Sequence, residues 1–166
     1  VCGDVAGSYQ FTHAAEVHAS VIINNLFSPF KKKLNNDSMA WVTYTSPEIA
    51  TFGLHEEQLK ERGVDYERIE TSFKDDDRAI VSESTKGKLI VYVSKGKILG
   101  GSMIGEHAGE LVQELIVAQT LNLPIKSMFS RVYPYPTATR INKRMMGKYM
   151  AGKLTPTLKK IFKWLY

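Results

Sequence analysis

The stretch KLIVYVSKGKILGGSMIG, residues 88–105, decides the fold of this chain. It holds two apolar runs rich in β-branched residues, with Ser94-Lys95-Gly96-Lys97 between them. Short strands joined by a glycine-containing turn are typical of an antiparallel hairpin. Gly100 and Gly101 in the second run predict a bulge or the close approach of another backbone. We therefore expect an antiparallel sheet built around this hairpin.

Further strands and helices are expected on both sides of the hairpin. The aromatic and β-branched residues of 39–45 predict a strand, and so does the alternation in 66–73. Helical spacing of apolar residues, capping residues and terminal glycines predict four helices, at 11–27, 55–63, 106–122 and 137–152. The expected fold class is α+β, an antiparallel sheet with helices packed on it.

Several local features follow from the same patterns. Thr12 is expected to cap the first helix. Pro47 is expected to begin a short helix or turn that Gly53 ends, and residues 75–78 should form a polar loop. Apolar residues at helical spacing should form a buried stripe on two helices: Ala15, Ala19, Ile22 and Leu26 in 11–27, and Leu111, Leu115, Ala118 and Leu121 in 106–122.

Composition and charge narrow the function classes. The chain has 166 residues, 43% of them hydrophobic, which suits a packed domain with a short appendage. Its net charge of +5 comes from the last 26 residues, which hold seven Lys or Arg and no Asp or Glu. The nearly neutral remainder argues against a nucleic-acid partner. The single Cys2 excludes an internal disulfide and predicts a reducing compartment, the cytoplasm.

The first candidate site lies near the N-terminus. VCGDVAG, residues 1–7, is typical of a buried strand that ends in a loop, with Asp4 at the strand end. Gln10-Phe11-Thr12-His13 then opens a helix, whose first N–H groups suit a phosphate or carbonyl oxygen. Asp4 could accept hydrogen bonds from ligand hydroxyls. The alternative is an ordinary strand–turn–helix in which Asp4 is only a turn residue.

Two groups of histidines are candidates for a metal site or an acid–base site. His13 and His18 are five residues apart, which does not match the i, i+4 spacing of helical metal ligands. His107 stands beside Glu106 and near Glu110, a pattern compatible with acid–base chemistry. We interpret these residues as surface or helix-start residues and predict no metal site.

The second candidate site is YPYPT, residues 133–137, followed by Arg140. Two prolines stiffen this segment in an extended conformation, so the aromatic side chains are held at fixed points. Such a segment suits an interface or the wall of a pocket. A rigid connector whose aromatic rings pack into the core is the alternative.

Four motifs together resemble one enzyme family. They are CGDVAG…QFTHAAE, YTSPEIATFGLHEEQLKERG, DRAIV…GKLIVYVSKGKILGGSMIGEHAGELVQELIVAQ and YPYPT. In this order they resemble the C-terminal part of the flavin-dependent pyridine nucleotide–disulfide oxidoreductases, which include mercuric reductase and dihydrolipoamide dehydrogenase. The resemblance covers the chain to about residue 152.

The resemblance implies an organisation and a set of ligands. Residues 1–36 would be the end of an FAD-binding domain with its linker, 37–152 a dimerisation domain, and 153–166 a basic amphipathic tail. FAD would be the cofactor and NAD(P)H the co-substrate of a homodimer. The residues at the family's flavin-contact positions are Asp4, Gln10, Phe11, Thr12 and His13.

The chain departs from the family at one pair of positions. Disulfide-reducing members carry a His and, five residues later, a Glu that orients it as acid–base partner of the redox cysteines. Tyr135 and Arg140 stand at those positions here. Tyr has an ordinary pKa of about 10 and Arg accepts no proton, so this pair cannot replace the His as a proton shuttle. Dihydrolipoamide and glutathione are therefore not expected as substrates, and no catalytic residue is assigned.

Two functions remain in view. In the first, the chain is the interface domain of a flavin-dependent oxidoreductase. It presents Tyr133, Tyr135, Pro136 and Thr137 to the partner's flavin site, and it is inactive alone because the redox cysteine pair and the glycine-rich nucleotide motifs lie in other parts of such enzymes. In the second, it is a stand-alone homodimerising adaptor whose tail, 153–166, docks on an acidic partner or a membrane surface.

Overall fold

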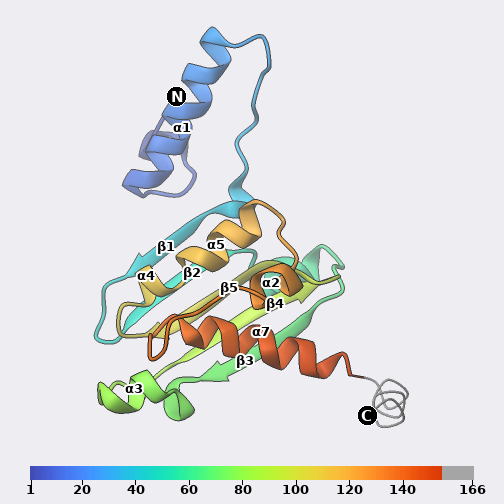
Figure 1. Ribbon diagram of the computed structural model, residues 1–166. Helices are drawn as coiled ribbons and strands as arrows, with labels where there is room; N and C mark the ends of the chain where they lie inside the picture. Colours follow the sequence, from blue (N-terminus) through green and yellow to red (C-terminus); the bar gives the residue numbers. More distant parts are fainter. Residues whose placement is uncertain (155–166) are drawn as a thin grey trace.

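A computed structural model describes residues 1–154, and the predicted tail at 153–166 lies almost entirely outside them. The centre of the fold is a five-stranded sheet of order β1-β2-β5-β4-β3, in which every neighbouring pair is antiparallel (Figure 1). The sheet confirms the predicted α+β class. Its strands are β1 (Ala40–Thr43), β2 (Glu48–Gly53), β3 (Glu67–Ser72), β4 (Lys88–Ser94) and β5 (Lys97–Gly105).

The hairpin of β4 and β5 forms as predicted. Its two-residue turn, Lys95 and Gly96, has φ values of 49° and 78°, and positive φ at both turn positions matches the twist of an antiparallel pair. The pairing shifts register between Tyr92 and Val93, which confirms the irregularity that the paired glycines predicted. A Cβ at Gly101 would collide with the carbonyl oxygen of Ile90 and lie 3.1 Å from a ring carbon of Phe52.

The prediction for residues 47–53 was wrong, because this segment is strand β2. Pro47 precedes the strand, and Gly53 is its last residue. β2 pairs with β1 on one side and with β5 on the other. The two ladders satisfy its backbone groups along both edges, and this tertiary pairing overrides the local signal of a proline at a possible helix start.

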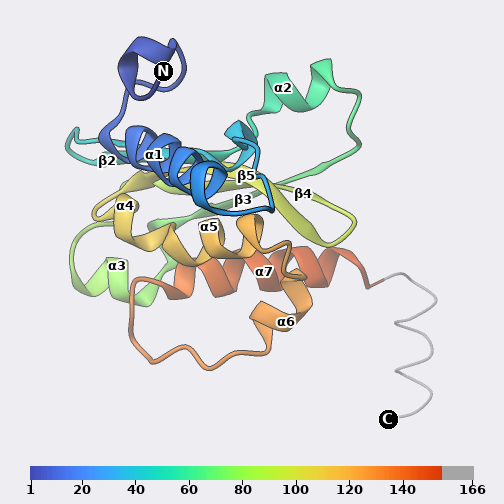
Figure 2. The same cartoon turned by 90° about the horizontal axis from the view of Figure 1, so that it is seen from above.

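Four helices cover one face of the sheet (Figure 2). The predicted helix 106–122 is two short helices separated at Val112, and Leu121 is exposed, while the other three residues of its stripe are buried. Helix 137–152 is confirmed except for its first residues. The four are α4 (Ala108–Leu111), α5 (Gln113–Thr120), α6 (Ile125–Phe129) and α7 (Arg140–Gly152).

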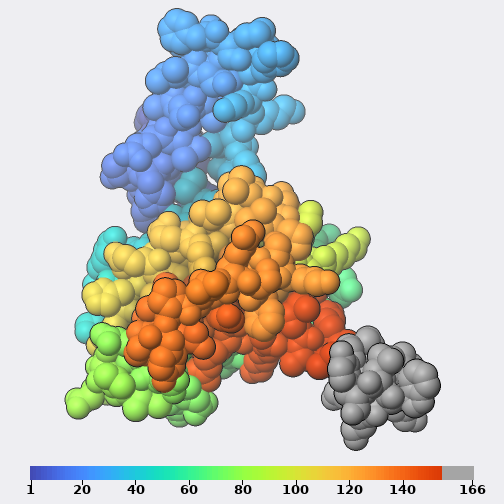
Figure 3. Space-filling model, in the orientation of Figure 1, coloured from blue at the N-terminus to red at the C-terminus, as the bar shows by residue number. Residues whose placement is uncertain are grey.

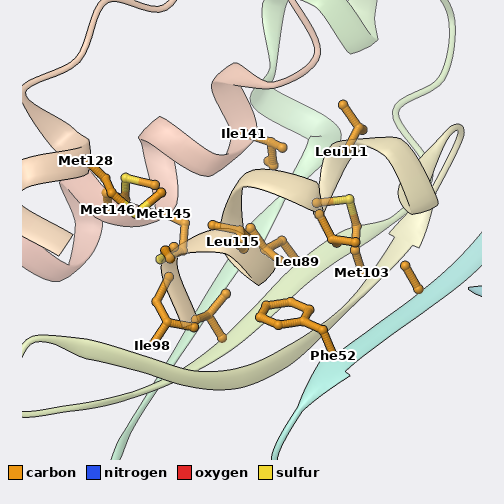
Figure 4. Close-up of a cluster of buried hydrophobic side chains, with 14 of the residues drawn as sticks. Phe52, Leu89, Ile98, Met103, Leu111, Leu115, Met128, Ile141, Met145 and Met146 are labelled. Carbon is orange, nitrogen blue, oxygen red and sulfur yellow. The ribbon is translucent and has the colours of Figure 1, made fainter. Parts of the chain in front are cut away.

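The core fills the space between this face of the sheet and the helices (Figure 4). Phe52, Leu89 and Met103 reach it from three strands, and Leu115 from α5 meets them. Helix α7 adds Ile141, Met145 and Met146, all completely buried. Methionine adapts its shape to irregular gaps, which suits the four methionines of this core, Met103, Met128, Met145 and Met146.

Two helices lie outside this layer. α2 (Glu56–Glu61) confirms the predicted helix, and Gly63 follows it with a φ of 62°, as expected at a helix C-terminus. The predicted polar loop at 75–78 was wrong: a 3₁₀ turn, Phe73–Asp75, leads into α3 (Asp77–Val81). Asp76 is buried and caps α3, because its Oδ1 accepts the N–H of Ala79 at 3.1 Å.

Helix α1 (Thr12–Phe27) stands beyond the β1 edge of the sheet (Figure 1). Its predicted stripe was wrong, because Ile22 and Leu26 are exposed while Ala14 and His18 are buried. Several other apolar side chains of α1 are also exposed, among them Val17, Ile23 and Phe27. Among residues 1–154, no helix combines the length and apolar character needed to span a bilayer.

Candidate functional site

The start of α1 leaves two backbone donors free of helical bonds. Phe11 is the N-cap residue, with extended backbone, and its carbonyl accepts the N–H groups of Ala14 and Ala15 at 3.0 and 3.1 Å. The N–H groups of Thr12 and His13 precede the first helical bonds and lie at the positive end of the helix dipole. The prediction that Thr12 caps the helix was wrong, because Thr12 is already helical and no side chain of the described residues, 1–154, caps α1.

His18 holds the N-terminal loop against α1. Its Nδ1 accepts the N–H of Gly3 at 3.2 Å, and its Nε2 lies 3.2 Å from the hydroxyl of Ser8. Since an amide N–H can only donate, Nδ1 is the unprotonated nitrogen and Nε2 donates to Ser8. The prediction of a buried strand in residues 1–7 was wrong: Asp4 begins a 3₁₀ turn, Asp4–Ala6, in the loop that His18 binds, and the Asp4 side chain is exposed.

The other predicted flavin-contact residues divide into two groups. Gln10 and Thr12 are exposed beside the free end of the helix. Phe11 and His13 contact the sheet domain: their rings stack at 5.3 Å, Phe11 lies 6.0 Å from Trp41, and His13 Nε2 lies 2.7 Å from the carbonyl oxygen of Ala40. The structure thus joins the helix start to β1 through these two side chains.

These residues fit part of an FAD site. The exposed carboxylate of Asp4 can accept hydrogen bonds from ligand hydroxyls. The free N–H groups of Thr12 and His13 can donate to an oxygen or nitrogen of a ligand ring, or to a phosphate. An open groove of about 800 Å³ continues from them between α1 and the sheet domain, and it is lined by Val17, Val21, Trp41, Gln113 and Ile116, among others. Figure 3 shows how α1 projects from the rest of the molecule.

The second candidate segment, Tyr133–Thr137, connects α6 to α7. Tyr133 is half-buried, and its hydroxyl donates to Glu114 Oε2 at 2.8 Å. Burial, and then the hydrogen bond to the Glu114 carboxylate, raise the pKa of Tyr133 well above its ordinary value. Tyr135, in contrast, is 67% exposed. One aromatic ring therefore anchors the segment, and the other is presented to the outside.

Tyr135 and Arg140 lie against each other. The guanidinium carbon of Arg140 is 5.2 Å from the centre of the Tyr135 ring. The Asp77 carboxylate beside the Tyr135 hydroxyl raises the pKa of Tyr135, and this effect outweighs the opposite influence of Arg140. Tyr135 is therefore protonated at neutral pH and cannot serve as a base. Asp77 was missed, because residues 75–78 carried no signal beyond polarity.

A third group of side chains gathers at the start of α4. One ligand-type atom from each of Glu48, His107 and Glu110 lies within 4.8 Å of the others. Glu48 Oε2 also accepts the N–H of Gly109 at 3.2 Å, and His107 is the N-cap residue of α4. The prediction of a helix-start position for His107 is confirmed. Glu48 was missed because it comes from β2, sixty residues away in the sequence.

Comparison with known proteins identifies the family. Residues 39–146 match the family described as pyridine nucleotide-disulphide oxidoreductase, dimerisation domain. The chain is 32% identical over 137 residues to a mercuric reductase of Staphylococcus aureus, covering 81% of this chain and 25% of that protein. It is 34% identical over 137 residues to a dihydrolipoyl dehydrogenase of Buchnera aphidicola subsp. Schizaphis graminum, covering 81% of this chain and 29% of that protein.

Solved structures share the fold. LpdA from Mycobacterium tuberculosis superposes with a TM-score of 0.83 at 20% identity, over 90% of this chain and 33% of that one. The HOCl-induced flavoprotein disulfide reductase RclA from Escherichia coli superposes with a TM-score of 0.78 at 21% identity, over 88% and 34%. The chain spans roughly a quarter of the length of the curated relatives that it matches. It belongs to the pyridine nucleotide-disulphide oxidoreductase family, and residues 39–146 are the dimerisation domain of that family.

Proposed function

We propose that this chain is part of a homodimeric, FAD-dependent NAD(P)H oxidoreductase, in which residues 37–152 pair the subunits and residues 1–36 complete a flavin site. Family membership is the observation that carries the proposal. The free N–H groups at the start of α1, beside a loop that His18 fastens, support the flavin part. The single Cys2 and the absence of other cysteines in the sequence support a reducing compartment, and we propose the cytoplasm.

The residues present have distinct tasks in this proposal. When bound, FAD would supply the two-electron chemistry of the reaction. Asp4, Gln10 and Thr12 would hold and orient it through the exposed carboxylate, the amide and the free helix N–H groups. Phe11 and His13 would keep that site in register with the sheet domain through their contacts with Trp41 and Ala40.

The Tyr133–Thr137 segment would meet the flavin site of the partner subunit. Its exposed ring, Tyr135, carries the hydroxyl that stands where a His serves as proton shuttle in disulfide-reducing members of the family. Asp77 raises the pKa of that hydroxyl further above neutral pH, and a guanidinium accepts no proton. We therefore propose that the acceptor substrate is reduced without a side-chain base at this position, which argues against dihydrolipoamide and glutathione.

The test uses the full-length protein that contains this chain. We expect it to purify yellow, with the visible absorbance of a bound flavin, and to sediment as a dimer. Asp4→Ala should weaken FAD binding, because the exposed carboxylate is lost. Asp65→Asn is the matched control, since Asp65 is exposed and takes part in the fold through its backbone carbonyl. A colourless protein that also fails to take up added FAD would overturn the proposal.

A further inference from the structure

The Tyr133–Thr137 segment is held in place by side chains. Within residues 1–154, the backbone N–H groups of Val132, Tyr133 and Tyr135 donate to no backbone carbonyl, and the prolines have no N–H to donate. The segment therefore takes its position from the groups that bind its side chains and carbonyls.

Glu114 on α5 is the centre of these bonds. Its Oε2 accepts the hydroxyl of Tyr133 at 2.8 Å, and its Oε1 accepts Nδ2 of Asn142 on α7 at 2.7 Å. Asn142 is completely buried, and its Nδ2 also donates to the carbonyl oxygen of Leu111 at 2.7 Å. One carboxylate thus ties the segment to α5 and to α7 at the same time.

Tyr133 is fixed at three points. Its hydroxyl is bound by Glu114, its carbonyl oxygen accepts Nη1 of Arg140 at 3.2 Å, and the ammonium of Lys143 lies 5.4 Å from the centre of its ring. Tyr135 follows two residues later, between two prolines that leave few conformations open. The place of the Tyr135 ring therefore depends on the place of Tyr133.

Among residues 1–154, Glu114 has no charged partner that would give it a different role. None of the ion pairs among residues 1–154 includes it. The raised pKa of Tyr133 keeps its hydroxyl a donor at all physiological pH values. The Glu114–Tyr133 bond is therefore formed by a permanent donor and a carboxylate acceptor, a strong type of hydrogen bond in proteins.

We propose that Glu114 is a positioning residue: through Tyr133 it sets where Tyr135 stands at the subunit interface, where Tyr135 would help to place an acceptor against the FAD of the partner subunit. This inference rests on the proposed function above, in which the Tyr133–Thr137 segment meets the flavin site of the partner. Glu114 lies outside the YPYPT motif, nineteen residues before Tyr133, so the motif by itself does not point to it.

The test measures flavin reoxidation in the full-length enzyme, reduced anaerobically with dithionite. Two oxidants are compared by stopped flow: dichlorophenolindophenol, a two-electron dye that must dock near the flavin, and ferricyanide, a one-electron oxidant that reacts at longer range. Glu114→Gln places an amide N–H₂ against one of the two donors, and Tyr133→Phe removes the hydroxyl. Each variant should slow the dye reaction on the order of tenfold and leave the ferricyanide reaction unchanged.

Matched controls come from the other side of the sheet. Tyr66 donates to Glu56 Oε1 at 2.9 Å in the same kind of bond, so Tyr66→Phe and Glu56→Gln should leave both rates unchanged. The double variant of Glu114 and Tyr133 should be no slower than Glu114→Gln alone, because Tyr133→Phe removes an interaction that Glu114→Gln already disturbs. Melting temperatures identify any variant that fails to fold, and Tyr133→Phe is the milder of the two changes.

Tyr135→Ala separates this inference from the proposed function. If Tyr135→Ala slows the dye reaction while Glu114→Gln and Tyr133→Phe do not, the positioning role is overturned and the placement of the segment stands. If Tyr135→Ala leaves the dye rate unchanged, the segment does not serve the flavin site and the positioning role is overturned, while the proposed function is still decided by FAD binding and dimer formation. Slowing of the dye reaction by all three, with normal ferricyanide rates, supports the positioning role.

Discussion

At the scale of single residues, His18 has the clearest structural task. It is 6% exposed, and both ring nitrogens are occupied, one by the N–H of Gly3 and the other by the hydroxyl of Ser8. A histidine on an apolar helix face gave no sequence signal for such a clamp, because its partners lie ten and fifteen residues away in a loop. The clamp sets where Asp4 stands relative to the start of α1.

We expect His18→Leu to weaken FAD binding in the full-length protein. The substitution leaves the Gly3 N–H without its acceptor and frees the loop, a loss of about 1–3 kcal/mol, or roughly ten- to a hundredfold in affinity. Titration of the apoprotein with FAD measures it. Glu16→Gln, an exposed change on the same helix, is the control. Equal FAD affinity in His18→Leu and the control would show that the loop needs no clamp.

At the scale of elements, the sequence predicted the β4–β5 hairpin and the irregularity at its paired glycines. It did not predict β2 or the division of α4 from α5. A hairpin is a local structure, and positive φ at Lys95 and Gly96 follows from its turn chemistry. β2 exists because β1 and β5 pair with it from both sides, and those partners are distant along the chain. In the candidate sites, the side chains that hold the predicted residues in place, His18, Asp77 and Glu114, could not be predicted, because their partners are distant in the sequence.

The packing of β5 between its neighbours predicts a large effect of Gly101→Ala. The new Cβ would meet the backbone oxygen of Ile90 and the ring of Phe52, and neither can move without disturbing the sheet. We expect a loss of about 2–4 kcal/mol in the free energy of unfolding, measured with urea. Gly152→Ala is the control, because it ends α7 and a Cβ there meets nothing within 4 Å. Similar stability of the two variants would contradict this account of the packing.

At the scale of the whole molecule, surface carboxylates predict how stability depends on pH. The pKa of Asp37 is lowered from 3.8, chiefly by its hydrogen bond with Arg62. The pKa values of Glu56 and Glu70 are lowered from 4.5, chiefly by hydrogen bonds with Tyr66 and Arg68 respectively. A depressed folded-state pKa means that the stabilisation is complete above the unfolded value and is lost as pH falls through the folded one.

Urea unfolding at pH 7 and at about pH 3 should show this loss, which is small because the groups are exposed. Arg62→Gln should lower the free energy of unfolding slightly at pH 7 and less at the acid pH, since Asp37 is then partly protonated and the pair contributes less. Lys31→Gln, a change outside the ion pairs within residues 1–154, should show no such pH dependence. An Arg62→Gln effect that is equal at both pH values would contradict the assignment.

Residues 1–27, which include α1, contact the domain that holds the sheet through Trp41. Loss of the Trp41 side chain should therefore weaken flavin binding before it unfolds the sheet. The Trp41 ring lies 5.6 Å from that of Tyr9, 6.0 Å from Phe11 and 5.2 Å from His55. In the full-length protein, flavin release and loss of secondary structure should coincide on heating. In Trp41→Ala, flavin release should move to lower temperature than unfolding, because the site loses its support before the sheet does. Tyr44→Ala changes an exposed side chain just after β1 and is the control, in which flavin release and unfolding should still coincide. If the two transitions also coincide in Trp41→Ala, contacts other than those of Trp41 anchor α1 and the loop around Asp4.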